Sequence, residues 1–440
     1  MSYPASVTPF LRRLAAHTTN TFKIEPSGAR SSVGAGQVVS FSLPSNTLLD
    51  LRSLKWMFNA QATGDNARLP NDISSLIERY TVEAGGVTIY QGHLGYNVVK
   101  QAKDALSMSG DFEDSFAAAM AHENIPRLVD GDGTTLTDPA PEAPSSANDA
   151  TQFCVSKWIG FMEAQPYILD TSLCAELVLK VFLAPNSVIP TATATDSVAN
   201  FTAGGAAAGS YTINNQRLLV TCYGIQDGTF DMMMEQRIKE QGFIEVPFKS
   251  YATFFDNQHN GSSRFSLGTQ SLDAVYAVWR KPDYQSASNV VAVSGFNSSI
   301  ENSAHKGEKY QANYFAMPKP TGITSAQFSI NGSLYPQFPA TPDEWYGLSM
   351  DAVHSQYDLN AGSKVKSRAA WNNNYHVYAI RLNQPDADGL RLVSGLDSRS
   401  LNMAGYLNTT GVTNSPPCVI IAECTSTWRI GASMSSAVVV

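Results

Sequence analysis

The sequence contains few charged residues and lacks long apolar runs. Lys, Arg, Asp and Glu make up 15% of the 440 residues, against about a quarter in an average soluble domain. No run reaches the roughly 18 apolar residues that a membrane-spanning helix needs. The first twenty residues also lack the apolar core of a signal peptide. We therefore expect a soluble chain that carries no signal for secretion.

Basic clusters and paired cysteines are also missing. The formal net charge is -8 and the chain has no block of Lys and Arg, which argues against a protein that coats nucleic acid. The cysteine count is five, an odd number, with no CxxC pair. We predict reduced core cysteines in a reducing compartment. They are Cys154, Cys174, Cys222, Cys418 and Cys424.

Motifs for metals and cofactors are absent. The seven histidines form no HxH or HExxH pattern, so zinc is not expected. Asp130 and Asp132 begin like a calcium loop, but Pro141 stands where a bidentate Glu is needed. No Walker loop, no GxGxxG after a strand and no GxSxG elbow is present. We expect no metal, no cofactor and no enzymatic activity.

The chain does contain one pattern of strands and turns that occurs twice. Residues 37–58 read QVVSFSLPSNTLLDLRSLKWMF, and residues 263–279 read SRFSLGTQSLDAVYAVW. Phe41 aligns with Phe265, a polar turn follows each, and Leu51–Phe58 aligns with the second predicted strand downstream. The copies lie about half a chain apart, a spacing that indicates a duplicated domain.

Two further similarities follow in the same order. A hairpin with a Gly or Asn-Gly turn precedes a helical segment in each half, and a Leu-Asp pair precedes a later strand. The second helix has a capping box, with Thr341 as its N-cap and Glu344 at the third position. The matching segments are 80–92 with Val99, Ala102 and Leu106; 328–338 with Trp345, Leu348 and Ala352; and 167–183 with 394–407.

These patterns predict an all-β fold of two tandem jelly rolls, with a short helix inside each half and a linker helix between them. Many short alternating strands, separated by turns and long connections, favour a jelly roll over an up-and-down barrel. The predicted parts are an N-terminal arm (1–20), a first jelly roll (21–226), a linker helix (227–242) and a second jelly roll (243–440). We also predict a helix over 95–120, a strand over 153–162, and long loops over 128–150, 186–210 and 281–308.

A few side chains are candidates for a site. Asp111, Glu113 and Asp114 cluster after the first helix, where a solvated helix end or an acid/base pair would fit. Asp343 and Glu344 are explained by helix capping and the helix dipole. The aromatic candidates are core or interface anchors, or platforms for sugars: Trp345, Tyr346, Trp371, Tyr375 and Tyr378.

The N-terminal arm combines apolar and basic residues. Phe10, Leu11 and Leu14 with Arg12 and Arg13 would form one or two amphipathic helical turns. The alternatives are a packed terminal arm, and an arm that meets an anionic membrane or a neighbouring subunit on the inner face.

Two successive jelly rolls, each with a helix after its central hairpin, resemble the double jelly-roll major capsid proteins. This family includes coat proteins of tailless membrane-containing bacteriophages, adenovirus hexon, virophages and large DNA viruses. The stretch VVSFSLPSNTLLDLRSLKWMF is similar to the opening strands of such coats in small viruses. The resemblance covers nearly the whole chain after residue 20 and brings no catalytic residues.

The resemblance implies a homotrimer that looks hexagonal, with its barrels perpendicular to the shell of an icosahedral virion. Its implied partners are copies of itself, neighbouring trimers, vertex and minor capsid proteins and, as one option, an underlying lipid membrane. No specific nucleic-acid contact is expected, and folding and assembly would occur in the host cytoplasm. Two alternatives stay open: an enzyme acting on glycans that resembles peptide-N-glycosidases, and a β-sandwich attachment protein that binds host sugars.

Overall fold

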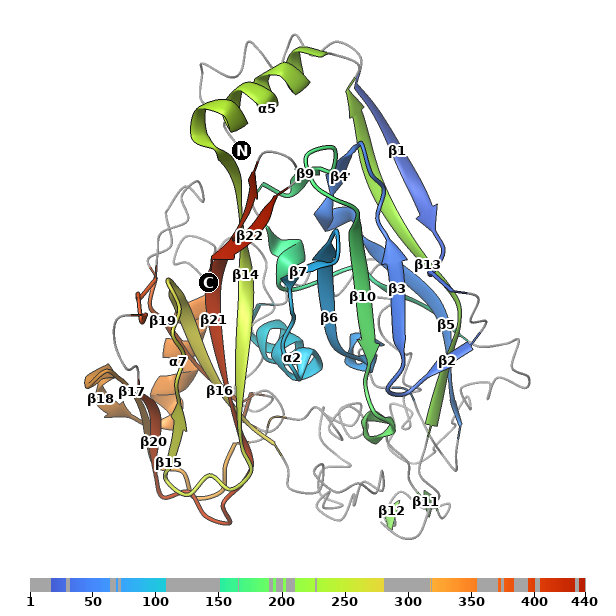
Figure 1. The fold of residues 1–440 in the computed structure, drawn as a ribbon. Helices are drawn as coiled ribbons and strands as arrows, with labels where there is room; N and C mark the ends of the chain where they lie inside the picture. The colour runs from blue at the N-terminus through green and yellow to red at the C-terminus, as the bar shows by residue number, and fades with distance from the viewer. Residues whose placement is uncertain are drawn as a thin grey trace.

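The described part of the chain is built almost entirely from antiparallel strands (Figure 1). The computed structural model describes residues 17–28, 32–63, 69, 73–107, 151–164, 166–189, 193–194, 201–202, 210–225, 228–280, 317, 319–353, 371–372, 376–383, 395–399, 404–431 and 435–439. These residues form four large sheets and one two-stranded pair. Two sheets belong to each half of the chain, which gives two β-barrels.

The first barrel has one sheet in the order β8-β5-β13, with β1 and β2 pairing along β13 and β4-β9 continuing beside it. The second sheet has the order β3-β10-β6-β7. The strands are β1 (His17–Ile24), β2 (Ser32–Gly34), β3 (Val38–Ser42), β4 (Leu48–Asp50), β5 (Lys55–Thr63), β6 (Ile77–Ala84), β7 (Val87–Tyr90), β8 (Thr151–Val155), β9 (Ile168–Asp170), β10 (Leu177–Leu183), β11 (Thr193–Ala194), β12 (Phe201–Thr202) and β13 (Ser210–Ile225).

The second barrel has sheets in the orders β14-β21-β16-β19 and β15-β20-β17-β18, with β22 pairing along β21. Its strands are β14 (Phe243–Asp256), β15 (Ser262–Phe265), β16 (Leu272–Trp279), β17 (Ser325–Ile330), β18 (Ser333–Ala340), β19 (Val377–Arg381), β20 (Gly405–Thr410), β21 (Cys418–Gly431) and β22 (Ser436–Val439).

The two barrels repeat one topology. Strands β1, β13, β5 and β8 correspond to β14, β21, β16 and β19, and the facing sheets correspond in the same way. The jelly-roll duplication predicted from sequence is therefore confirmed. Phe41 on β3 and Phe265 on β15 are both at most 1% exposed, so the repeated phenylalanine serves the same packing role twice.

Three α-helices are described, and two of them are counterparts. α2 (Tyr96–Ser107) and α7 (Pro342–Val353) each follow the central hairpin of a barrel, and α5 (Gly228–Gln241) links the barrels. The predicted capping box of α7 is present, because the Glu344 carboxylate accepts from the Thr341 N–H at 2.7 Å. Gly242, with φ of +81°, ends the linker helix as predicted. The 3-10 turns are η1 (Leu51–Ser53), η2 (Ile73–Leu76), η3 (Phe161–Glu163) and η4 (Asn186–Val188).

Some predicted boundaries differ from the structure. The strand predicted over 153–162 ends at Val155, because Gly160 has φ of +94° and the chain then enters η3. The loop predicted over 186–210 contains η4, β11 and β12. Pairing with β13 begins at His17, inside the predicted arm. The helix predicted over 95–120 is described only to Ser107, and the loops 128–150 and 281–308 lie outside the described residues.

The buried hydrophobic residues form two cores, and one of these cores includes residues of both barrels. The second barrel encloses its own core around Trp279, Trp345 and Tyr378. The opposite face of its β14-β21-β16-β19 sheet packs into the same continuous core as the first barrel. All eight residues of β16 are buried as a result. One sheet of the second barrel is thus covered on both faces, which fixes the barrels against each other.

Candidate functional site: the junction between the barrels

The side chains proposed from sequence do not assemble into a site. The arm residues Phe10, Leu11, Arg12, Arg13 and Leu14 lie outside the described residues, as do Asp111, Glu113, Asp114, Asp130, Asp132, Pro141 and Tyr375. Trp345, Trp371 and Tyr378 are fully buried, and Tyr346 packs on Trp371 with ring centroids 5.4 Å apart. The first three are core residues and cannot present a flat surface to a sugar. The five cysteines are buried and free, as predicted.

The junction between the barrels has an apolar centre. Phe161 of η3 is 0% exposed and contacts Phe248 of β14 and Trp428 of β21, with ring centroids 5.2 and 6.0 Å away. Tyr90 of β7 meets the Phe248 ring edge-on at 5.9 Å. Aromatic pairs in such geometries add to the free energy of burial. This cluster joins an edge of the first barrel to a sheet face of the second.

A tight turn holds Phe161 and Glu163 in place. Gly160 has φ of +94°, and a Cβ there would lie 2.3 Å from the Tyr90 hydroxyl oxygen, so only glycine fits. The Gly160 N–H donates to the Glu163 carboxylate at 2.9 Å, and the Glu163 N–H donates back to the Gly160 carbonyl at 2.9 Å. The turn therefore orients the Glu163 carboxylate before it meets the second barrel.

A polar cluster borders the aromatic centre. Lys103 of α2 lies 3.3 Å from Glu163 and 3.7 Å from Glu423 of β21. The Tyr251 hydroxyl of β14 donates to Glu163 at 2.9 Å and accepts a short hydrogen bond from Lys103. Tyr276 of β16 donates to Glu423 at 2.9 Å. Lys103 is thus shared between a carboxylate of its own barrel and one of the other barrel.

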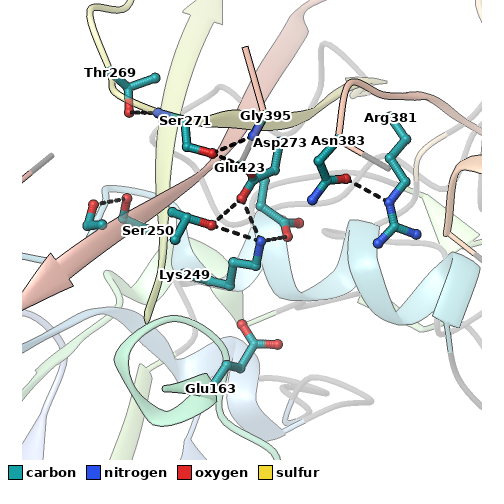
Figure 2. A network of polar contacts seen from close by, with 12 residues as sticks. Glu163, Lys249, Ser250, Thr269, Ser271, Asp273, Arg381, Asn383, Gly395 and Glu423 are labelled. Carbon is teal, nitrogen blue, oxygen red and sulfur yellow. Dashed lines mark hydrogen bonds and ion pairs between the residues drawn. The ribbon is translucent and has the colours of Figure 1, made fainter. Parts of the chain in front are cut away.

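The cluster continues across the sheet of the second barrel (Figure 2). Lys249 of β14 points toward Asp273 of β16 at 2.5 Å and Glu423 at 3.6 Å. It also donates to Thr425 at 3.1 Å. Asp273 accepts from Ser271 at 2.7 Å, and the Ser271 oxygen accepts the N–H of Gly395 at 2.7 Å. Each buried charge therefore has charged and neutral partners, as buried ions require.

Neighbouring charges set the ionisation of the junction. Burial raises the pKa of Glu423, but Lys103 and Lys249 outweigh it and hold this pKa below its ordinary value. Burial, with the nearby carboxylates Glu163 and Glu423, raises the pKa of Tyr251 well above its ordinary value. Glu423 is therefore an ionised carboxylate at neutral pH, and Tyr251 is a neutral phenol.

His93 adds a neutral group to the same region. It is 6% exposed and packs against the rings of Tyr96 and Tyr251, with centroids 5.9 and 5.3 Å away. Among the described residues neither ring nitrogen has a hydrogen-bond partner. Burial, together with the charge of Lys103, lowers the pKa of His93 to about 3. The imidazole is therefore uncharged at neutral pH.

A second polar group, in the second barrel, is arranged for structure. The His259 ring lies 2.5 Å from the Ser263 hydroxyl and 2.6 Å from that of Thr409. Ser263 donates its proton to Asp256. In a nucleophilic triad the carboxylate would orient the histidine and the histidine would take the serine proton. Here the serine hydrogen is committed to the carboxylate and Ser263 is 2% exposed, so the group closes the turn between β14 and β15.

The described residues contain neither a cluster of metal ligands nor a membrane-spanning helix. No group there of three or more His, Cys, Asp or Glu side chains is arranged to hold a metal ion. No helix among the described elements is long and apolar enough to cross a membrane.

Sequence reasoning missed the polar cluster, although a signal was present. Lys249 interrupts the run IEVPFKSYATFF, and Glu423 interrupts VIIAECTS. A single charge in the middle of an apolar strand is unusual and indicates a buried partner of opposite charge. The two lysines near Glu423, Lys103 and Lys249, lie far from it in the sequence, so the pairing could not be read from local spacing.

Replacing Lys103 by methionine is expected to lower the free energy of unfolding by about 3 kcal/mol, because Glu163 and Glu423 would lose a buried ionic partner. Urea denaturation followed by tryptophan fluorescence measures this. The matched control is Lys180→Met, since the Lys180–Glu83 pair at 2.7 Å is more exposed and such pairs contribute about 1 kcal/mol or less. Equal losses in both variants would contradict a special role for the junction.

No family model and no curated protein sequence matches the chain. Solved structures do match. The chain is similar to VP54 of PBCV-1, fitted into a reconstruction of the virophage Sputnik, with a TM-score of 0.57, 13% identity and 96% of each chain covered. It is similar to the Faustovirus major capsid protein, with a TM-score of 0.55, 11% identity, and coverage of 94% of this chain and 90% of that one.

A third match is a chain of the Sputnik virophage structure, with a TM-score of 0.53, 12% identity, and coverage of 96% of this chain and 88% of that one. These matches span both barrels and the linker between them. They show that the chain has the double jelly-roll fold of viral major capsid proteins, as the sequence resemblance implied.

Proposed function

We propose that this chain is the major capsid protein of an icosahedral virus, a structural subunit with no enzymatic role. The observation that carries the proposal is the pair of barrels with one topology, locked together by a buried junction. The likeness to capsid proteins over nearly the full length supports it. The chemistry of the described junction serves packing, since its ionic groups are engaged with one another.

The proposed assembly is a homotrimer with a pseudo-hexagonal outline. Six barrels related by about 60° would close a ring when each barrel contacts the next in the same way, and the chain already contains one such contact. In this proposal the barrels stand perpendicular to the shell, and neighbouring trimers, vertex proteins and minor capsid proteins complete it. The arm around Phe10 and Arg12 would face inward, toward a membrane or a neighbouring subunit, and assembly would take place in the host cytoplasm before the protein becomes part of the virion.

The native mass of the purified protein tests the proposal. Light scattering after size-exclusion chromatography should give a mass near three times 47.5 kDa, and negative-stain images should show hexagonal particles. A chain that stays monomeric at high concentration, with no such particles, would contradict the capsid proposal.

A further inference from the structure

The amine of Lys249 and the carboxylate of Asp273 meet across a strand that separates their own strands. β21 lies between β14, which carries Lys249, and β16, which carries Asp273. The Lys249 Nζ lies 2.5 Å from the Asp273 Oδ2 (Figure 2). A register shift between Leu272 and Ala274 adds Asp273 as an extra residue opposite β21, and such a bulge re-aims a side chain. Three paired strands therefore hold the two groups in contact.

The pair is shielded from water. The side chain of Asp273 is 2% exposed and that of Lys249 is 21% exposed, because this sheet face packs against the first barrel. Two groups held together in a folded site react as if each were present at a very high concentration of the other. Exclusion of water also protects a product that water would hydrolyse. The site therefore favours a reaction between the two side chains.

The groups around Asp273 are arranged for a condensation. Its Oδ1 accepts from the Ser271 hydroxyl at 2.7 Å. Its Oδ2 accepts from Lys249 and from the Thr425 hydroxyl. A carboxylate oxygen of Glu423 lies 3.6 Å from the Lys249 Nζ. A proton acceptor thus stands beside the nitrogen, and a hydrogen-bond donor stands beside the oxygen that would become negative during attack on the carboxyl carbon.

We propose that Lys249 and Asp273 condense to an isopeptide bond, with Glu423 as the catalytic carboxylate. One ammonium proton passes along the hydrogen bond to Oδ2, which leaves a neutral amine and a carboxylic acid. The amine nitrogen attacks Cγ, and the Ser271 hydroxyl donates to the oxyanion that forms at Oδ1. Glu423 takes a second proton from the nitrogen and delivers it to Oδ2. The carbonyl re-forms as the Cγ–Oδ2 bond breaks, one water molecule leaves, and the third proton stays on the amide nitrogen.

The bond ties β14 to β16 across β21, within the sheet that carries the junction. It closes a loop of the chain from residue 249 to residue 273, and a closed loop limits the freedom of the unfolded chain as a disulfide does. All reacting groups belong to one chain, so the proposal does not depend on the capsid function.

Peptide mapping of the fully denatured protein tests the proposal. Trypsin cuts after free lysine and arginine side chains, so the bond would block the cut after Lys249. Residues 240–264 and 265–280 should then appear as one branched peptide, lighter than the sum of its two parts by one water molecule. The peptides 250–264 and 265–280 should be missing in free form. Tandem mass spectrometry locates the two bonded residues.

The same digest contains an internal control. Lys180 and Glu83 lie 2.7 Å apart but are more exposed, so the cut after Lys180 should be complete and the peptides 158–180 and 80–100 should carry no bond. The variant Lys249→Arg keeps a positive charge beside Asp273 and removes the amine. It should yield no branched peptide.

The role of Glu423 is tested separately. Glu423→Gln keeps the size of the side chain and removes the proton carrier, so the branched peptide should form more slowly by about a hundredfold or more. Its amount is followed by mass spectrometry from fresh purification onward, and circular dichroism checks the fold. The matched control is Glu163→Gln, the same change on the carboxylate that contacts Lys103, which should leave the bond at the wild-type level.

The wild-type digest decides on the bond even where a variant fails to fold. A complete cut after Lys249, with recovery of the free peptide 265–280, would overturn the proposal and leave an ion pair only. Equal amounts of branched peptide in the wild type and in Glu423→Gln would overturn the role of Glu423 while the bond stands. The native mass of the protein tests the capsid function independently of both results.

Discussion

Replacing Phe161 by alanine is expected to lower the free energy of unfolding by about 3–5 kcal/mol, the usual cost of emptying a buried aromatic site. Phe161 is 0% exposed and contacts Phe248 and Trp428 of the other barrel. The lost contacts join the two barrels, so thermal unfolding should separate into two transitions in the variant. Differential scanning calorimetry measures both effects.

The matched control is Phe182→Ala. Phe182 lies on β10, half-buried on an outer sheet face, where the Arg79 guanidinium covers its ring at 4.1 Å. Its removal should cost about 1 kcal/mol and leave the shape of the transition unchanged. If Phe161→Ala melts like this control, the junction does not couple the barrels energetically.

The barrels themselves could be predicted because their signals are local and repeated. Alternation in Val39-Ser40-Phe41-Ser42-Leu43 marks a strand with one buried face. The same phenylalanine position recurs in Phe265, and Thr341 with Glu344 marks the start of a helix. Each pattern needs only a few neighbouring residues. Because the domain is duplicated, each pattern occurs twice in the sequence and supports the same topology in both halves.

The junction could not be predicted because its contacts are distant and its strands do not alternate. β16 is buried at every residue. Its sequence, LDAVYAVW, therefore has no alternation of apolar and polar residues that would indicate which face meets the first barrel. The turn at Gly160 depends on Tyr90, which belongs to another element. The strand predicted through this turn was wrong for that reason. The sequence of Trp371 and its neighbours fits either a core residue or a platform for a sugar. Only its complete burial in the structure identifies it as a core residue.

The junction distinguishes the contact within the chain from the contacts between subunits that the proposed capsid would need. The contact within the chain combines aromatic packing with a buried ionic cluster, so it forms once, on folding. In the proposed capsid, low overall charge would limit repulsion between subunits whose contacts are repeated many times.

Acid is expected to destabilise the protein through His93. Its native pKa is about 3, below the ordinary value of 6.5, so the unfolded chain binds more protons between these pH values. Stability contributed by the neutral imidazole is therefore complete above pH 6.5 and falls as the pH decreases toward 3. At about 1.4 kcal/mol for each unit of pKa, the loss amounts to about 4–5 kcal/mol.

The variant His93→Phe isolates this effect, since it keeps a ring against Tyr96 and Tyr251 and removes the titration. Urea denaturation of both proteins at a series of pH values should show a stability difference that is constant above pH 6.5 and shifts in favour of the variant by about 4 kcal/mol near pH 3. Glu423 also loses its contribution below pH 4.5, but it does so in both proteins and cancels in the difference. Parallel stability curves over the whole range would show that His93 is not buried as a neutral group at the junction.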